Sequence, residues 1–393
     1  MNKVFKLYVM PGGTKAPETF QSTRLWLPTT PYGLLDIWDR LGLSADEPVW
    51  LNITDTAIPN FPQLPLENEA NCFLDDLYAL DLLAQKLSEF DKADRLAFAG
   101  LLRREEAQRK NALNVPRLIE LVCGIDRCHV LPAVTTDGQL GEFVVEYGLD
   151  AELEELPDEA LDWLHSKGLL NYPELGRRHR LAENGVYVRD EDCGICGYVE
   201  QYMELPEMDR QPDLHMERPD YAVLLRMSDG REMKLPTEEP LPDGSFTCLD
   251  CRIPAIAEMI GQEQEPDAVN RFAQTLDKLT PREILVCKAV IEAAACSTLE
   301  QVTDVIRHVD EYILAPDQRT PADWAQGMLP VMLNGREKKE LAPLVRLQRC
   351  GEALMRRMHC AATAYGVVKR GDGQPLTQPA EEPEEMAGME GMR

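Results

Sequence analysis

The sequence predicts an α+β fold that occurs twice, as two tandem repeats along one chain. Three observations predict it. Short runs alternate between apolar and polar residues, longer runs place apolar residues every three or four positions, and the two halves carry similar motifs in the same order. Of the 393 residues, 44% are hydrophobic, so both halves can bury a core.

Alternation and turn residues predict the first elements. Residues 4–9 alternate as a strand does, a Gly12-Gly13 turn follows, and residues 22–27 can return antiparallel. Residues 31–41 carry an apolar helical face and predict a short helix.

The clearest helix spans about residues 71–90, where apolar residues fall at steps of three or four. The other expected elements are a strand at 49–53, helices at 92–110 and after Asn114-Val115-Pro116, strands at 128–131 and 142–146, a helix at 157–164 and a strand at 221–225.

The two halves share segments in conserved order and spacing. The matching pairs are Leu27–Thr29 with Leu235–Thr237, Asp55–Pro59 with Asp250–Pro254, Leu83–Leu87 with Phe272–Leu276, and Ile125–Cys128 with Val309–Tyr312. Chance similarity of two amphipathic helix pairs is the alternative, but it would not preserve the flanking Asp and Pro positions. The expected domains are a first repeat at 1–200, a linker at 201–219, a shorter second repeat at 220–370 and a disordered tail at 371–393.

The chain is strongly acidic. It has 68 Asp and Glu against 41 Lys and Arg, a formal net charge of -27. Residues 1–200 hold 34 acids and 19 bases, a net charge of -15, which leaves -12 for the remainder. This field disfavours direct binding of nucleic acid. It indicates either solubility or salt adaptation, which need no partner, or a surface displayed to a basic partner.

The charge is densest between Gly141 and His165, where no Lys or Arg occurs. The acids of this stretch, which we call the acidic ridge, are Glu142, Glu146, Asp150, Glu152, Glu154, Glu155, Asp158, Glu159 and Asp162. The apolar residues among them are expected to hold the ridge against a core: Leu153, Leu156, Leu161, Trp163 and Leu164. We interpret the ridge as a partner-binding surface. The alternative is a solvated helix face, with its first acids favoured by the helix dipole.

The number of surplus negative charges fits the charge density of a DNA duplex. Because DNA carries one negative charge per about 1.7 Å of axis, a surplus of 27 charges would match about 45 Å of duplex if most lay on one face. Lys and Arg that ordinarily meet phosphates would then meet carboxylates.

An ordered series of motifs resembles the ArdA-type antirestriction proteins. The series runs through Leu27-Pro28-Thr29, Ile53-Thr54-Asp55, Asp126-Arg127-Cys128, Leu156-Pro157-Asp158-Glu159, Leu175-Gly176-Arg177 and Gly197-Tyr198-Val199. The resemblance implies an elongated molecule with small sheets flanking a helical bundle. It also implies a cytoplasmic DNA mimic, carried by a mobile element, that occupies the DNA-binding groove of a type I restriction-modification enzyme. The alternative is an acidic protein that sequesters another DNA-handling protein, such as a nuclease effector or a repressor.

The sequence departs from the family after Gly176-Arg177, where an acid is usual and Arg178 stands instead. This basic cluster puts the family's homodimer contact in question. We expect either a monomer in which the two repeats form an internal pseudo-dimer, or a homodimer.

The sequence gives less support to a zinc-binding protein or an enzyme. Cys193, Cys196, Cys248 and Cys251 form two Cys-x-x-Cys pairs that could together bind zinc, but a long gap separates the pairs, and we predict no metal and no cofactor. No nucleophile elbow, phosphate loop or His ligand spacing occurs, so we predict that the protein is not an enzyme. Without a signal peptide or a long apolar run, a cytoplasmic location is expected.

Overall fold

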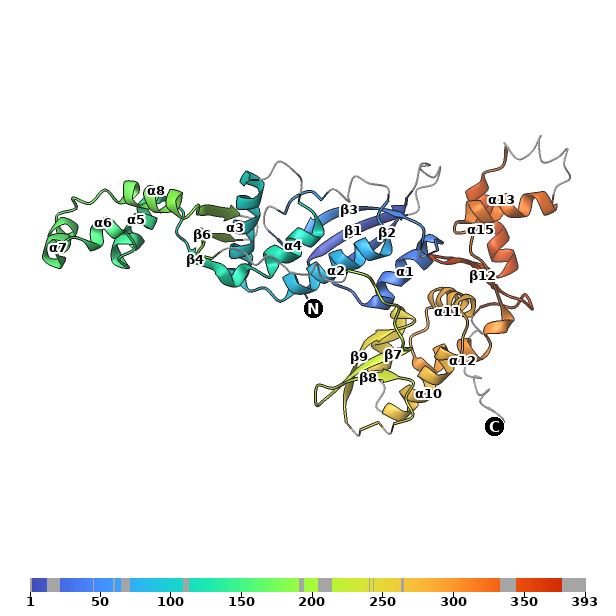
Figure 1. Ribbon diagram of the computed structural model, residues 1–393. Coiled ribbons are helices and arrows are strands. Elements are labelled where there is room, and N and C mark those ends of the chain that lie inside the picture. The colour runs from blue at the N-terminus through green and yellow to red at the C-terminus, as the bar shows by residue number, and fades with distance from the viewer. Residues whose placement is uncertain are drawn as a thin grey trace, which may run out of the picture. The chain divides into compact units, whose positions relative to one another are not determined.

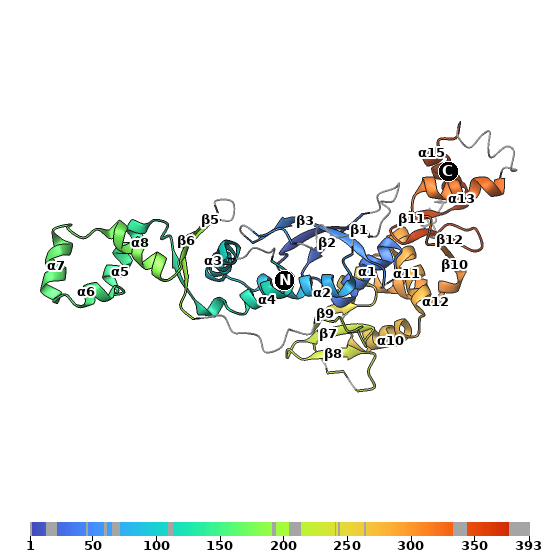
Figure 2. The same ribbon diagram turned by 45° about the horizontal axis from the view of Figure 1, so that its top comes forward.

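The computed structural model describes residues 2–12, 22–44, 46–58, 61–64, 71–108, 113–190, 194–203, 214–239, 241–242, 244–262, 265–332 and 344–376. The chain divides into two compact units. Unit 1 comprises residues 1–29 and 45–217, and unit 2 comprises residues 30–44 and 218–393. In its described residues each unit combines helices with two three-stranded antiparallel sheets (Figures 1 and 2). This confirms the predicted α+β class with small antiparallel sheets.

Unit 1 opens with a sheet in the order β2-β1-β3. Its strands are β1 (Phe5–Pro11), β2 (Thr23–Leu27) and β3 (Val49–Thr56). On the central strand the buried side chains alternate along the chain, as expected when one face of a sheet covers a core: Phe5, Leu7 and Val9. The three strands predicted in this region are confirmed.

Three helices follow this sheet: α2 (Leu74–Ser88), α3 (Lys92–Gln108) and α4 (Val115–Val122). Helix α2 buries the apolar face that its spacing predicted, namely Leu77, Leu80, Leu83 and Leu87. Helix α4 starts at Val115 because the side chain of Asn114 accepts a hydrogen bond from the N–H of Arg117, and because Pro116 suits the first turn. The predicted helices are confirmed, with α2 starting three residues later than expected.

The second sheet of unit 1 has the order β4-β6-β5. Its strands are β4 (Cys128–Pro132), β5 (Val186–Asp190) and β6 (Ile195–Gln201), and a short 3₁₀ turn at Ile125–Arg127 leads into β4. Between β4 and β5 the chain forms α5 (Asp137–Glu146), α6 (Ala151–Glu154), α7 (Asp158–Ser166) and α8 (Tyr172–Ala182) (Figure 1).

The strand predicted at 142–146 is wrong, because these residues form the second half of α5. Thr136 caps the helix by accepting a hydrogen bond from the N–H of Gln139. Leu140 and Val144, one turn apart, are buried together against Tyr198. The two valines alone suggested a strand, but the cap and the four-residue spacing of the buried side chains decide for a helix.

The expected linker and tail lie partly outside the described residues, at 204–213 and 377–393. At the described end of the linker, Asp75 of α2 accepts a hydrogen bond from the N–H of Met216, which is only 5% exposed. Leu376 likewise packs against the core of unit 2. The ends of both segments are therefore held by contacts with the folded units.

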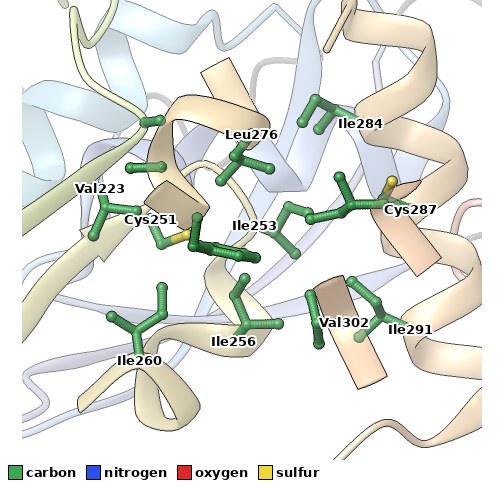
Figure 3. Packing of buried hydrophobic residues seen from close by; sticks show 14 of the residues in the cluster. Val223, Cys251, Ile253, Ile256, Ile260, Leu276, Ile284, Cys287, Ile291 and Val302 are labelled. Carbon is green, nitrogen blue, oxygen red and sulfur yellow. The ribbon is translucent and has the colours of Figure 1, made fainter. Parts of the chain in front are cut away.

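Unit 2 also opens with a three-stranded sheet, in the order β8-β7-β9. Its strands are β7 (Val223–Met227), β8 (Glu232–Leu235) and β9 (Phe246–Cys251), and a 3₁₀ turn follows at Pro254–Ile256. The helices that follow are α9 (Ala257–Gln262), α10 (Pro266–Asp277), α11 (Pro281–Ala294) and α12 (Leu299–Arg307). The main core of the unit lies among them, with Ile253, Leu276 and Ile291 in contact with the same cluster (Figure 3).

Among the described residues that follow, unit 2 forms a second sheet, in the order β10-β12-β11, together with helices α13 and α15. The elements are a 3₁₀ turn (Val309–Glu311), β10 (Tyr312–Ala315), α13 (Pro321–Met332), α15 (Leu347–Met358), β11 (Ala361–Thr363) and β12 (Gly366–Arg370).

The helix predicted at 31–41 is α1 (Pro31–Leu41), and it belongs to unit 2 although the chain before and after it belongs to unit 1. At its start the N–H of Tyr32 donates to the buried carboxylate of Asp250 on β9, at 3.2 Å. At its end the guanidinium of Arg319 donates to the carbonyl of Arg40. An acid at the first turn and a base at the last turn both suit the helix dipole.

A buried ion pair holds the middle of α1. The ammonium of Lys288, on α11, lies 2.7 Å from the carboxylate of Asp36 and 2.6 Å from that of Asp39. Arg40 and the hydroxyl of Tyr365 also bond to Asp36. Burial acts to raise the pKa of Asp36, but the charges of Lys288 and Arg40 and their hydrogen bonds outweigh it, so the pKa lies below its ordinary value.

Candidate functional site

The acidic ridge lies on three consecutive helices of unit 1. By element, Glu142 and Glu146 lie on α5, Asp150, Glu152, Glu154 and Glu155 on or beside α6, and Asp158, Glu159 and Asp162 on α7. The exposed members are Glu142, Glu146, Glu152, Glu155, Glu159 and Asp162. The side chains of Glu154 and Asp158 lie outside the described part of the structure. Asp150 differs from the others, since its carboxylate caps α6 by accepting from the N–H groups of Glu152 and Leu153.

Helix α8 holds the first helix of the ridge in place. Helices α5 and α8 lie side by side (Figures 1 and 2), and two glycines let their backbones touch. A Cβ on Gly141 would lie 1.9 Å from the carbonyl oxygen of Tyr172, and a Cβ on Gly176 would lie 2.0 Å from that of Asp137. No side chain fits at either position. Close packing therefore fixes α5, and with it Glu142 and Glu146, against α8.

The basic cluster of α8 is paired with acids. Arg178 lies 3.0 Å from Glu152 and 3.9 Å from Asp150, and so supplies a base that the ridge lacks in sequence. Arg180 pairs with Asp137 at 2.8 Å. The sequence could not reveal this compensation, because it arises from the packing of α8 against α5.

The ridge also displays large apolar side chains. Trp163 of α7 is 56% exposed, and Tyr147, Leu149, Leu156 and Leu169 are exposed as well. The expectation that Leu156 and Trp163 hold the ridge against a core is therefore wrong. Leu153, Leu161 and Leu164 are half-buried and form the packed side of these short helices. A surface that combines acids with exposed aromatic and aliphatic groups is typical of a protein-binding site.

Beside the ridge, a buried carboxylate binds two histidines, an arrangement that the sequence did not suggest. Glu200 of β6 is 8% exposed, and one of its oxygens lies 2.8 Å from His179 Nε2 and 2.9 Å from the hydroxyl of Tyr198. The other oxygen lies 3.4 Å from His129 Nδ1. Burial opposes the charged form of Glu200, but the hydrogen bonds from His179 and Tyr198 outweigh it and hold its pKa below the ordinary value. The same bond raises the pKa of His179.

We expect the His179–Glu200 pair to stabilise unit 1 most between about pH 4.5 and 6.5, the ordinary pKa values of the two groups. The contribution of His179 is complete below its ordinary pKa and is lost as pH rises through its raised pKa. The contribution of Glu200 is complete above its ordinary pKa and is lost as pH falls through its lowered pKa. Urea unfolding at pH 5.5 and 8.5 measures the alkaline loss, and His179→Gln should reduce it. An equal loss in both proteins would contradict the assignment to His179.

The cysteines of the proposed zinc pairs lie in different settings. Cys193 lies outside the described residues, Cys196 is exposed on β6, and Cys251 is buried in the core of unit 2. Burial raises the pKa of Cys248 to about 12, which disfavours the thiolate that zinc requires. Within the described ranges, no group of three His, Cys, Asp or Glu side chains could hold a metal ion.

Comparisons with protein-family models, with curated proteins and with solved structures find no match to the chain. Among the described residues, no helix is long and apolar enough to cross a membrane.

Proposed function

We propose that the chain is an acidic DNA mimic of the ArdA type, which occupies the DNA-binding groove of type I restriction-modification enzymes. The observation that carries this proposal is the ridge, a run of exposed carboxylates held on helices α5 to α7. Carboxylates on packed helices keep a fixed spacing, as phosphates do on a duplex, and no folding is needed when the partner binds.

The exposed apolar groups support a protein partner. A surface that served only solubility or salt adaptation would gain nothing from exposing Trp163 and Tyr147 among its acids. A basic groove made for DNA offers Lys and Arg together with their aliphatic stems, and both parts find complements here.

Tandem duplication of one unit is the second part of the proposal, and the registers of the first sheets support it. The pairing of β1 with β3 shifts between Lys6 and Leu7, and that of β7 with β9 shifts between Leu224 and Leu225. These registers place Asp55 where unit 2 has Asp250, which is the alignment that the sequence motifs give.

A hydrogen bond that occurs in both units and the strand order of the second sheets also support the duplication. Asp81 on α2 accepts a hydrogen bond from the N–H of Thr29, and Asn270 on α10 accepts one from the N–H of Thr237. The two threonines occupy equivalent positions in the two repeats, and so do the two acceptors. The orders β4-β6-β5 and β10-β12-β11 are equivalent, and each has helices between its first two strands in sequence. With both copies in one chain, we expect a monomer that acts as an internal pseudo-dimer.

Transformation of unmodified plasmid DNA into cells with a type I restriction system tests the proposal. We expect cells that express the protein to yield roughly tenfold or more transformants, because an occupied groove cannot bind DNA. A type II restriction enzyme serves as the control and should restrict as before. No protection against several type I systems would overturn the target that we propose.

A further inference from the structure

A cavity of about 470 Å³ opens in unit 1 among β4, α5, α8 and the end of β6. This volume is within the range of ligand pockets. The cavity adjoins the ridge, because Phe143 and Tyr147 line it from α5, the helix that also carries Glu142 and Glu146. Helix α5 therefore contributes both to the wall of the cavity and to the ridge.

Two pairs of stacked or tilted rings form part of its wall. The rings of Phe143 and Tyr147 have centroids 4.3 Å apart, and His129 stacks on Tyr202 with centroids 4.5 Å apart and an interplanar angle of 27°. Aromatic faces of this kind attract flat cations.

Two carboxylates that line the cavity can accept hydrogen bonds from a guest. Glu183 of α8 lines the cavity and is exposed, and Glu200 lines it from β6. His179 and Tyr198 bond to one oxygen of Glu200, and the other oxygen has a long 3.4 Å contact with His129. That second oxygen, on a side chain that is 10% exposed, can accept a shorter hydrogen bond from a guest.

We propose that this cavity is the socket for an arginine side chain that the basic partner inserts when it binds the ridge. A guanidinium is flat, stacks on aromatic rings and donates several hydrogen bonds to carboxylates, whereas an ammonium is compact and more strongly hydrated. That the arginine comes from a protein partner rests on the proposed function. At the equivalent register positions unit 2 has Ile313 and Lys369, where unit 1 pairs His129 with Glu200.

The first test uses the whole protein and a small probe, N-acetyl-arginine amide, followed by NMR of the rings of His129 and Tyr147. We expect the probe to bind about tenfold or more tightly than its uncharged citrulline counterpart, because the citrulline loses a charge-assisted pair. Tyr147→Ala and Glu183→Gln should each weaken binding roughly threefold. Both side chains are exposed, so neither change should unfold the unit. Glu106→Gln makes the same charge change on α3, outside both the cavity and the ridge, and should leave probe binding unchanged.

The second test measures inhibition of a type I enzyme by the Tyr147→Ala, Glu183→Gln double variant. Loss of both probe binding and inhibition supports the socket. Equal affinity for the arginine and citrulline probes overturns it. Probe binding that is lost without any loss of inhibition assigns the cavity to a free small cation and overturns the partner's arginine as occupant. If the unchanged protein binds the probe but inhibits no type I enzyme, the proposed function fails and the arginine preference of the cavity stands.

Discussion

Neutralising the exposed acids of the ridge should weaken binding to a type I restriction-modification enzyme by roughly one to three orders of magnitude. The variant leaves Glu152, which pairs with Arg178, and replaces the other five exposed acids with Gln or Asn: Glu142, Glu146, Glu155, Glu159 and Asp162. An exposed ion pair contributes about 0.2–1 kcal/mol, so five together contribute about 1–5 kcal/mol. The dependence of binding on salt should also become shallower, because fewer charges are neutralised on association. Titration calorimetry at two salt concentrations measures both effects.

A matched variant separates the ridge from net charge. It removes the same number of charges from exposed acids elsewhere in unit 1, namely Asp46, Asp55, Glu89, Glu106 and Asp126. We expect this variant to bind within about threefold of the unchanged protein, because each lost charge is screened within about 10 Å at ordinary salt. Equal losses in the two variants would mean that total charge, and not the ridge, determines binding.

Local patterns in the sequence predicted most of the elements. The apolar spacing of α2 and the Asn114 cap of α4 are local signals, and the structure agrees with both. At 142–146 the sequence predicts a strand, and the prediction is wrong because two adjacent valines also fit a helix. The cap at Thr136 and the burial of Leu140 with Val144 decide for the helix, and only packing against β6 reveals that burial.

The candidate site was predictable in part. The run of acids without Lys or Arg is visible in the sequence, but its partial neutralisation depends on how the fold places Arg178 of α8 beside Glu152 of α6. The cavity depends on residues far apart in sequence, with His129 and Glu200 meeting only because β4 pairs with β6. A pattern of long-range pairing of this kind leaves no local signal.

Replacing Lys288 with Met should destabilise unit 2 by about 3–5 kcal/mol. Its side chain is 4% exposed and neutralises Asp36, whose side chain is 8% exposed, so its loss leaves a buried carboxylate with less compensation. Helix α1 should be affected most, because its residues Asp36 and Asp39 form ion pairs with Lys288 of α11. Urea unfolding of the whole chain gives the free energy, and hydrogen exchange shows whether the loss is located in α1 and α11.

Two controls make the interpretation of Lys288→Met specific. Lys278→Met removes an exposed lysine just after α10 and should change the free energy of unfolding by less than about 0.5 kcal/mol. The double variant Lys288→Met, Asp36→Asn should recover part of the loss, because it removes the buried charge that the single variant leaves. No recovery would mean that Lys288 acts through packing and not through its charge. A loss below about 1 kcal/mol in the single variant would mean that Arg40 and Tyr365 are sufficient to hold Asp36, and that the ion pair is not what binds α1 to unit 2.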